Sequence, residues 1–191
     1  YEVPLITVVT NLRKLMAKPI ERIGVVRRAQ LAVFVEKQAK LARREGILVE
    51  EEEVSGSPNS SELKRALRRV RQRSEALWVL NDDKLLTPRL IADGWLPGVS
   101  ERPWIPTIVG AGSLVAPTQS FGTFAVLPDH TALGTQAAAM VFDLAESDWT
   151  LSEGARAQLP LSTTTTVDLV QTKERFMLRE GALTQVDRIL Q

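Results

Sequence analysis

The sequence of 191 residues contains no cysteine, one histidine and one tyrosine, and aromatic residues make up only 5% of it. The lack of cysteine excludes disulfide bonds, thiolate metal sites and a cysteine nucleophile. The scarcity of aromatic residues argues against a binder of single-stranded nucleic acid, which stacks bases on exposed rings. A chain without cysteine suits an oxidising compartment without requiring one.

The sequence also lacks a long apolar run and a strong net charge. No stretch approaches the roughly 18 apolar residues of a membrane-spanning helix, and a net charge of +1 gives no global field toward nucleic acid or a membrane. Residues 1–73 nevertheless carry 16 Lys and Arg against 9 Asp and Glu. Much of this excess lies at 64–73, on a predicted helix whose charges we expect to be solvated and partly balanced by the glutamates at 50–53. We therefore expect no nucleic-acid partner.

Apolar runs and amphipathic stretches alternate along the chain. The β-branched run at 3–10 predicts a strand, and a strand there, rather than a signal peptide, is what we expect of a mature product or a fragment. Further strands are predicted at 22–26, 47–54, 75–80, 104–112 and up to Pro128, and helices at about 29–45, from Asn59, from Thr87 and after Asp129. This alternation predicts an α/β fold with three layers, a mostly parallel sheet covered by helices on both faces.

The tail, residues 161–191, departs from this rhythm. Its threonine run predicts an edge strand, and a helix should follow through Val170 and Met177. The spacing of Leu183, Val186, Ile189 and Leu190 predicts a last short helix.

Parallel sheets bind ligands outside the carboxyl ends of their strands. The strand ends therefore supply the candidate ligand-contacting residues. These are Arg27, Arg28, Asn81, Asp82, Asp83, the residues at 110–113, and Pro128, Asp129 and His130.

The pair Asp129 and His130 raises the question of catalysis. Neighbours in sequence do not normally form a catalytic dyad, which needs hydrogen-bond geometry around a substrate, and no Gly-x-Ser-x-Gly motif is present. Asp129 therefore either caps the following helix or contacts a ligand, and we expect no catalytic residue.

The turn Asn81-Asp82-Asp83 raises the question of a metal. Magnesium sites need a further carboxylate or a phosphate-binding loop, and neither a P-loop nor a Gly-x-Gly-x-x-Gly motif occurs. We expect helix capping or ligand hydrogen bonding here, with no metal and no cofactor. Among the tryptophans, Trp78 should lie in the core, whereas Trp95 and Trp104 either line a pocket or cover an end of the sheet.

The order of these motifs resembles a known family. ERIGVV, a helix ending in ARREGI, SSELKRAL, EALWVLNDD, IPTIVG and GTFAVLPDHTALGTQAAAMVFDLAES follow one another as in substrate-binding proteins of uncharacterised ABC-type importers, some of which bind aromatic amino acids. The likeness covers residues 3–178 and includes the Gly-x-x-Ala-Ala helix at 134–138. It implies a type I periplasmic-binding (flavodoxin-like) lobe with a C-terminal helical tail.

The resemblance implies a division of the chain and a ligand site. Residues 1–20 would be a strand and crossover left from a first lobe that is mostly missing, 21–160 the α/β lobe, and 161–191 a tail packed on the lobe or on that remnant. The family usually has small polar residues where this chain has Arg27 and Arg28. Its pattern places in the cleft Arg27, Arg28, Asn81, Asp82, Asp83, Phe121, Gly122 and Asp129.

Three functions compete. The first is a non-catalytic module that binds an amino acid or small organic acid, located in the periplasm or outside the cell, with a membrane transporter or signalling protein as its partner. The second is a lobe remnant that has lost its ligand and acts as a protein-interaction or structural module, with the exposed strand at 3–10 as a route to a homo-oligomer. The third, an enzyme on a flavodoxin-like sheet, has no supporting constellation.

Overall fold

The computed structural model describes residues 2–119, 121–150 and 160–191. In these ranges seven strands form one sheet, in the order β2-β1-β3-β4-β5-β6-β7. Neighbouring strands are parallel, except that β5 and β6 are antiparallel, which confirms the predicted α/β class with a mostly parallel sheet. The strands are β1 (Arg22–Arg28), β2 (Leu48–Val54), β3 (Ala76–Trp78), β4 (Thr107–Val109), β5 (Phe124–Pro128), β6 (Thr163–Asp168) and β7 (Arg188–Leu190).

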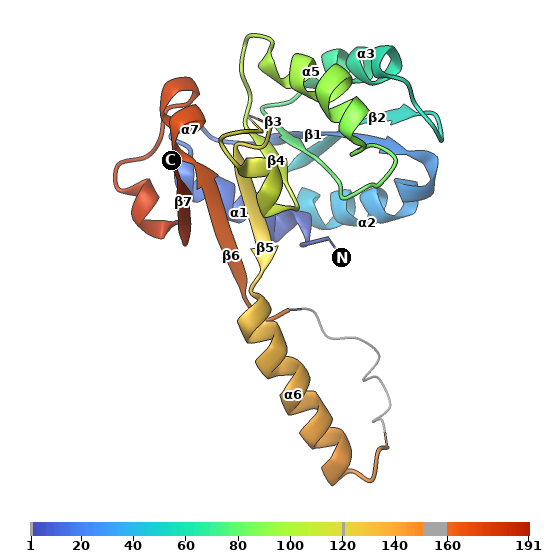
Figure 1. Ribbon diagram of the computed structural model, residues 1–191, viewed down its shortest axis with the longest axis vertical. Coiled ribbons are helices and arrows are strands. Elements are labelled where there is room, and N and C mark those ends of the chain that lie inside the picture. The colour runs from blue at the N-terminus through green and yellow to red at the C-terminus, as the bar shows by residue number, and fades with distance from the viewer. Residues whose placement is uncertain (1, 120, 151–159) are drawn as a thin grey trace.

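Helices cover both faces of the sheet. In Figure 1, α1 (Leu5–Leu15) and α2 (Ala32–Arg43) lie on one face, while α3 (Ser60–Arg71) and α5 (Leu96–Ser100) lie on the other. The remaining helices are α4 (Pro88–Leu90), α6 (His130–Glu146) and α7 (Leu169–Arg175), with the single turns η1 (Ala29–Leu31), η2 (Ile91–Trp95), η3 (Gly112–Val115) and η4 (Ala182–Gln185).

Two apolar clusters, one on each face, hold the layers together. Successive side chains of a strand point to opposite faces, so Trp78 of β3 joins the cluster under α1 and α2, while Leu77 joins the cluster under α3 and α5. Trp78 is 3% exposed, which confirms its predicted place in the core. Each cluster contains at least fifteen buried side chains, enough apolar surface to drive folding of the lobe.

The predicted strand at 3–10 is wrong, because these residues enter α1. Leu5, Val8, Val9, Leu12 and Leu15 are all buried, and their spacing of three and four residues places them on one helical face. Packing of that face outweighs the β-preference of the valines and threonines. With no strand at this place, the predicted route to an oligomer through its edge is wrong as well.

The tail is partly as predicted. The threonine run forms a strand as predicted, β6, which pairs antiparallel with β5, and α7 follows it. The prediction of an edge strand is wrong, because β7 lies on the other side of β6. The predicted last helix is wrong: only η4 is helical, and β7 pairs parallel with β6. The tail also contacts the start of the chain, because Met16 and Leu178 form an antiparallel bridge.

The helix α3 begins as its sequence predicts. The side chain of Asn59 accepts a hydrogen bond from the backbone N–H of Glu62 at 2.9 Å. The basic face of α3 is balanced by the edge strand β2, as expected, since Arg69 and Arg73 form ion pairs with Glu52 at 2.8 and 2.7 Å. Charged side chains on β2 also make this edge unsuitable for pairing with another strand.

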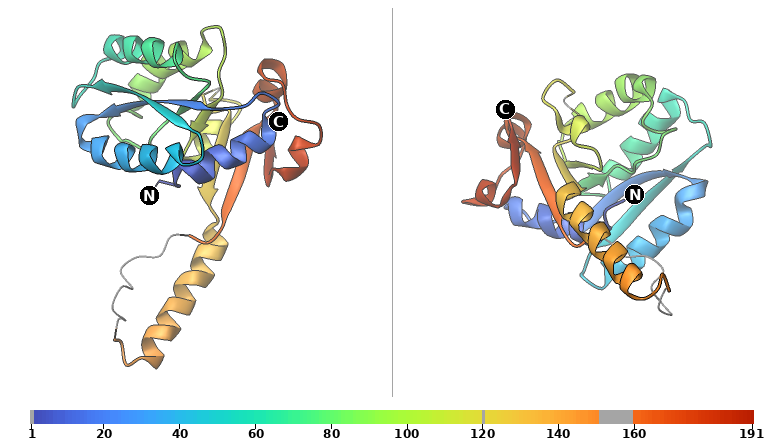
Figure 2. Two further views of the ribbon diagram at one scale, coloured as in Figure 1. Left: turned by 180° about the vertical axis from the view of Figure 1, so that it is seen from behind. Right: turned by 60° about the horizontal axis from the view of Figure 1, so that its bottom comes forward.

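The helix α6 stands apart from the rest of the lobe. It extends from the end of β5 into solvent as an arm, visible in both Figure 1 and Figure 2, and Gln136, near its first end, is its one buried residue. Val141 and Phe142 are 52% and 70% exposed. None of the described helices is long and apolar enough to cross a membrane.

Candidate functional site

The parallel pairing brings the carboxyl ends of five strands to one edge of the sheet, called here the carboxyl edge. β1 ends there in Arg28, β3 leads through buried residues to Asn81, and β5 ends in Pro128. The rule that places ligands beyond such strand ends therefore selects this edge.

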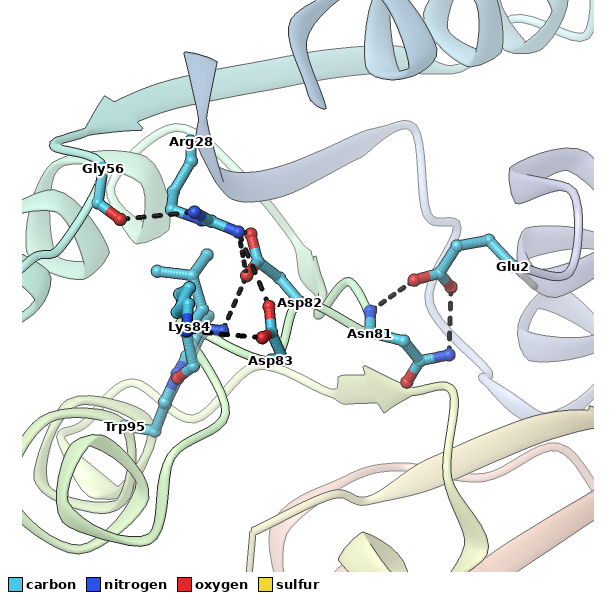
Figure 3. Close-up of polar contacts among 9 residues, drawn as sticks. Glu2, Arg28, Gly56, Asn81, Asp82, Asp83, Lys84 and Trp95 are labelled. Carbon is cyan, nitrogen blue, oxygen red and sulfur yellow. Dashed lines mark hydrogen bonds and ion pairs between the residues drawn. The ribbon is translucent and has the colours of Figure 1, made fainter. Parts of the chain in front are cut away.

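The centre of the carboxyl edge is an ion pair between Arg28 and Asp82. Arg28 Nε lies 2.7 Å from Asp82 Oδ2, and Nη2 lies 2.7 Å from Oδ1 (Figure 3), a bidentate geometry. Nη1 of Arg28 donates to the carbonyl oxygen of Gly56 at 3.2 Å. The Asp82 side chain is 1% exposed and that of Arg28 is 15% exposed, so the pair clamps the ends of β1 and β3 and the loop after β2.

The electrostatics of this pair favour its charged form. Burial is the largest single influence on Asp82 and raises its pKa, but the hydrogen bonds from Arg28 and from the backbone N–H groups of Lys84 and Leu85 together outweigh burial and lower the pKa below 3.8. The hydrogen bond to Asp82 raises the pKa of Arg28. Asp82 is therefore a carboxylate at neutral pH.

Asp83 and Lys84 are the solvent-facing members of the same turn. Their side chains are 79% and 59% exposed and lie 3.6 Å apart. Asp83 Oδ1 also lies 3.7 Å from Arg28 Nη2. The turn thus exposes one negative and one positive side chain. The buried Arg28–Asp82 ion pair next to it restricts the movement of its backbone.

Asn81 is held by the beginning of the chain. The carboxylate of Glu2 accepts a hydrogen bond from the Asn81 backbone N–H, and the Asn81 side-chain amide lies 3.4 Å from Glu2 Oε2 (Figure 3). Burial raises the pKa of Glu2 above its ordinary value. The sequence carries no signal for this contact, since a glutamate ahead of an apolar helix matches no motif.

A cavity of about 320 Å³ adjoins the turn. It lies between the loop after β2 and the segment that enters α4. Most of its lining residues are polar or charged, although the surface that they expose to the cavity is mainly apolar. Sequence reasoning missed these residues because the strand-end rule was applied only to the first residues after each strand. The lining includes Ser57, Asn59, Ser60, Lys84, Thr87 and Arg89.

Arg27 lies on the other side of β1 from Arg28. Its guanidinium pairs with two carboxylates of the edge strand β2, with Nε 2.6 Å from Glu51 and Nη1 2.6 Å from Glu53. Arg27 is therefore separated from the turn at 81–83 and bound within the lobe.

Phe121 and Gly122 do not reach the carboxyl edge, because they precede the first residue of β5. Phe121 is 1% exposed, and its ring lies 5.7 Å from that of Trp95. A Cβ on Gly122 would lie 2.6 Å from Val109 Cγ2 and 3.1 Å from the Leu114 carbonyl oxygen. Both residues are packed inside the lobe.

Asp129 caps α6. Its Oδ1 accepts hydrogen bonds from the backbone N–H groups of Thr131 and Ala132 at 3.0 and 3.1 Å, which confirms the capping alternative. His130 is exposed in the first turn of the helix. Within the described residues, no group of three or more acidic or histidine side chains lies close enough to hold a metal ion.

Comparisons with known proteins agree with this architecture. No protein-family model matches the sequence, and no curated protein matches it. Among solved structures, the ligand-free, open form of a substrate-binding protein with adhesive properties from Clostridium difficile is 14% identical, with a TM-score of 0.68, and the match covers 98% of this chain and 60% of that one. An ABC domain in complex with L-Trp from Streptococcus pneumonia is 15% identical, with a TM-score of 0.61 and coverages of 98% and 62%.

A conserved domain protein from Vibrio cholerae is similar as well, at 18% identity and a TM-score of 0.62, with 94% of this chain and 58% of that chain covered. The chain thus spans about three fifths of the length of each of these structures. Identities this low establish the fold alone. The chain has the fold of a periplasmic-binding-protein lobe, of the kind found in ABC-transporter substrate-binding proteins.

Proposed function

We propose that this chain is one lobe of a non-catalytic solute-binding module and that it contacts a small solute at the carboxyl edge. One observation carries the proposal: the buried Arg28–Asp82 pair fixes an exposed polar turn beside a cavity of about 320 Å³. Solute sites are concave and use a few rigidly held polar groups to orient the ligand.

The charges at this edge suit a zwitterion or a small acid. Because Arg28 is occupied by Asp82, the groups left for a solute are the exposed Asp83, Lys84 and Arg89. Asp83 can accept from an ammonium group, while Lys84 and Arg89 can donate to a carboxylate. An amino acid offers both groups, and one structural neighbour holds L-Trp, which supports this class of ligand.

We propose that α6 serves contact with a first lobe. The neighbours are longer than this chain by the remaining two fifths of their length, and in a two-lobed protein a second lobe closes on the solute. The exposed Val141 and Phe142 on α6 give a partner lobe an apolar surface to cover. On this proposal the module works outside the cytoplasm and delivers its solute to a membrane transporter or a signalling protein.

The competing function is a protein-interaction module. The specific observation in its favour is the same arm, since α6 exposes apolar side chains over most of its length. The two functions differ in what the carboxyl edge does, because an interaction module has no need of a solute there.

A thermal-shift screen against the common amino acids and small organic acids tests the proposal. A ligand that binds the folded chain should raise its melting temperature by several degrees at a hundredfold excess over Kd, and Asp83→Asn should abolish the rise. Asp143→Asn, an exposed carboxylate on α6, is the matched control and should leave the rise intact. No shift with any compound, together with a defined oligomer in light scattering, would favour the interaction module.

A further inference from the structure

A larger cavity lies at the opposite edge of the sheet. Its volume is about 690 Å³, within the size range of small-molecule sites. It is lined by residues that come just before β1, β3 and β4, such as Ile20, Glu75 and Pro106, so it lies at the amino ends of the parallel strands. It is therefore separate from the carboxyl edge.

Apolar side chains from three distant segments line this cavity. Met16 and Ile20 follow α1, Ile105 adjoins Trp104 ahead of β4, and Phe176 follows α7. The bridge between Met16 and Leu178 and the hydrogen bond from the Ala17 N–H to the Met177 carbonyl oxygen, 2.9 Å long, join the first and last of these segments. The apolar wall is thus assembled by the fold.

The aromatic wall, Trp104, is held in place. Its indole N–H donates to the carbonyl oxygen of Ser100 at 3.1 Å. Arg71 braces the same loop, donating to the carbonyl oxygens of Gly98 and Pro103 at 2.7 and 2.8 Å. A ring that is already ordered loses little conformational entropy when a ligand stacks on it.

Three cations lie at the Trp104 ring or in the cavity lining, and none has a carboxylate partner among the described residues. The guanidinium carbons of Arg102 and Arg175 lie 4.5 and 5.2 Å from the centroid of the Trp104 ring, and Lys18 lines the cavity. Two hydrogen bonds orient Arg175. Its Nη1 donates to the side-chain oxygen of Gln171 at 2.8 Å, and the Gln171 amide donates to the buried Asp168 carboxylate at 2.8 Å.

One acidic residue, Glu75, also lines the cavity but forms no ion pair with these cations among the described residues. The Glu75 carboxylate accepts hydrogen bonds from the backbone N–H groups of Glu21 and Arg22 at 2.6 and 3.0 Å. These neutral donors hold the carboxylate at the start of β1 and leave its negative charge in place. With two cations, Lys18 and Arg175, against one carboxylate, the cavity combines an apolar wall, an aromatic ring and an excess of positive charge.

We propose that this cavity is a second binding site, specific for an amphipathic organic anion with a flat apolar body and a carboxylate. The body lies against Trp104, Met16 and Phe176, where it leaves water. The carboxylate faces Lys18 and Arg175, whose guanidinium offers paired donors that match a carboxylate. A cation of the same shape would meet like charge.

The test is calorimetric titration of the full chain with naphthoate, with naphthol and acetate as controls for body and charge. Saturable binding of naphthoate with an affinity at least several-fold above that of naphthol, and no detectable binding of acetate, are expected. Trp104→Ala and the double variant Lys18→Gln/Arg175→Gln should each weaken naphthoate binding at least tenfold. Arg65→Gln, an exposed arginine on α3, is the matched control and should change nothing.

Three results would overturn the proposal. Absence of saturable naphthoate binding up to millimolar concentrations contradicts the site itself. Equal affinity for naphthoate and naphthol contradicts its preference for an anion. Binding that survives the variants at Lys18, Trp104 and Arg175 but is lost in Asp83→Asn places the ligand at the carboxyl edge. Circular dichroism spectra that match the unaltered chain ensure that each variant is folded.

Discussion

At the scale of single residues, the chain shows how an arginine beside a strand end can serve the fold. Arg27 and Arg28 follow one another, yet they point to opposite sides of β1 and meet different carboxylates. Both guanidinium groups are thereby neutralised inside the lobe. The polar groups left for contact at the carboxyl edge are those of the following turn.

Asp82→Asn is the first prediction. The substitution removes the charge that Arg28 and two backbone N–H groups stabilise, so we expect a loss of about 2 kcal/mol in the free energy of unfolding at neutral pH. Urea unfolding measures it. Asp83→Asn, at a carboxylate that is 79% exposed, should cost less than about 0.5 kcal/mol.

The pH dependence of this loss follows from the direction of the pKa shift. The pKa of Asp82 is lower in the folded chain than its ordinary value of 3.8, so the carboxylate contributes stability that is present above pH 3.8 and is lost as the pH falls through the folded-state pKa. The difference between the unaltered chain and Asp82→Asn should therefore shrink under acid conditions below pH 3.8. A difference that stays constant there would contradict the assigned role of the charge.

Gly122→Ala is the second prediction. The added Cβ would meet Val109 and the Leu114 carbonyl oxygen, and overpacking of this kind costs about 1–3 kcal/mol. Gly134→Ala on α6 is the control, because nothing lies within 4 Å of a Cβ there and alanine favours a helix. Thermal unfolding should show a lower melting temperature for the first variant alone; equal melting temperatures would mean that Gly122 has room.

At the scale of elements, α1 and α6 are opposites. α1 buries a complete apolar face against the sheet and shares its cluster with Phe124 and Val167, so it belongs to the core. α6 is longer, yet Gln136, in its second turn, is its one buried residue. Gln136 accepts a hydrogen bond from the Leu161 N–H, and the capping residue Asp129 accepts one from Ser162. A helix with so little cover contributes little to the stability of the sheet.

Removal of the arm is the third prediction. β5 and β6 are antiparallel, and Pro128 pairs with Thr163, so a short Gly-Asn turn can replace residues 129–162. We expect the shortened chain to unfold cooperatively with a melting temperature within a few degrees of the original, measured by calorimetry. Loss of cooperative unfolding would contradict the independence of α6 from the lobe.

The sequence predicted elements best where local and tertiary signals agree. The start of α3 has a capping residue, Asn59, that the sequence identifies and the structure confirms. The strands β1 and β2 come from apolar or β-branched runs, and they pair with each other in the sheet. It failed at 5–15, where β-branched residues suggested a strand but the burial of one helical face decided the structure. The prediction from sequence was also wrong at 183–190. The apolar residues there have helical spacing, but the last of them form β7, which is stabilised by pairing with β6.

At the scale of the whole molecule, the position of strand ends selects one edge of the sheet but does not predict the contacts along it. Arg28 and Asp82 were both predicted to contact a ligand. In the structure they bind each other. A pair formed between two distant segments cannot be recognised from the sequence of either segment. Phe121 and Gly122 were placed at the cleft by resemblance alone and lie at the amino end of β5. The contact of Glu2 with Asn81 was not predicted, because Glu2 belongs to no recognisable sequence motif.

The proposed function requires that the carboxyl edge receives a small solute. The most direct measurement is titration of the ¹⁵N-labelled chain with L-tryptophan and a panel of other amino acids, followed by amide chemical shifts. Saturable shifts are expected for at least one of them, concentrated at residues 57–60 and 81–86. Shifts that are absent for every compound, or that gather away from this edge, would contradict it.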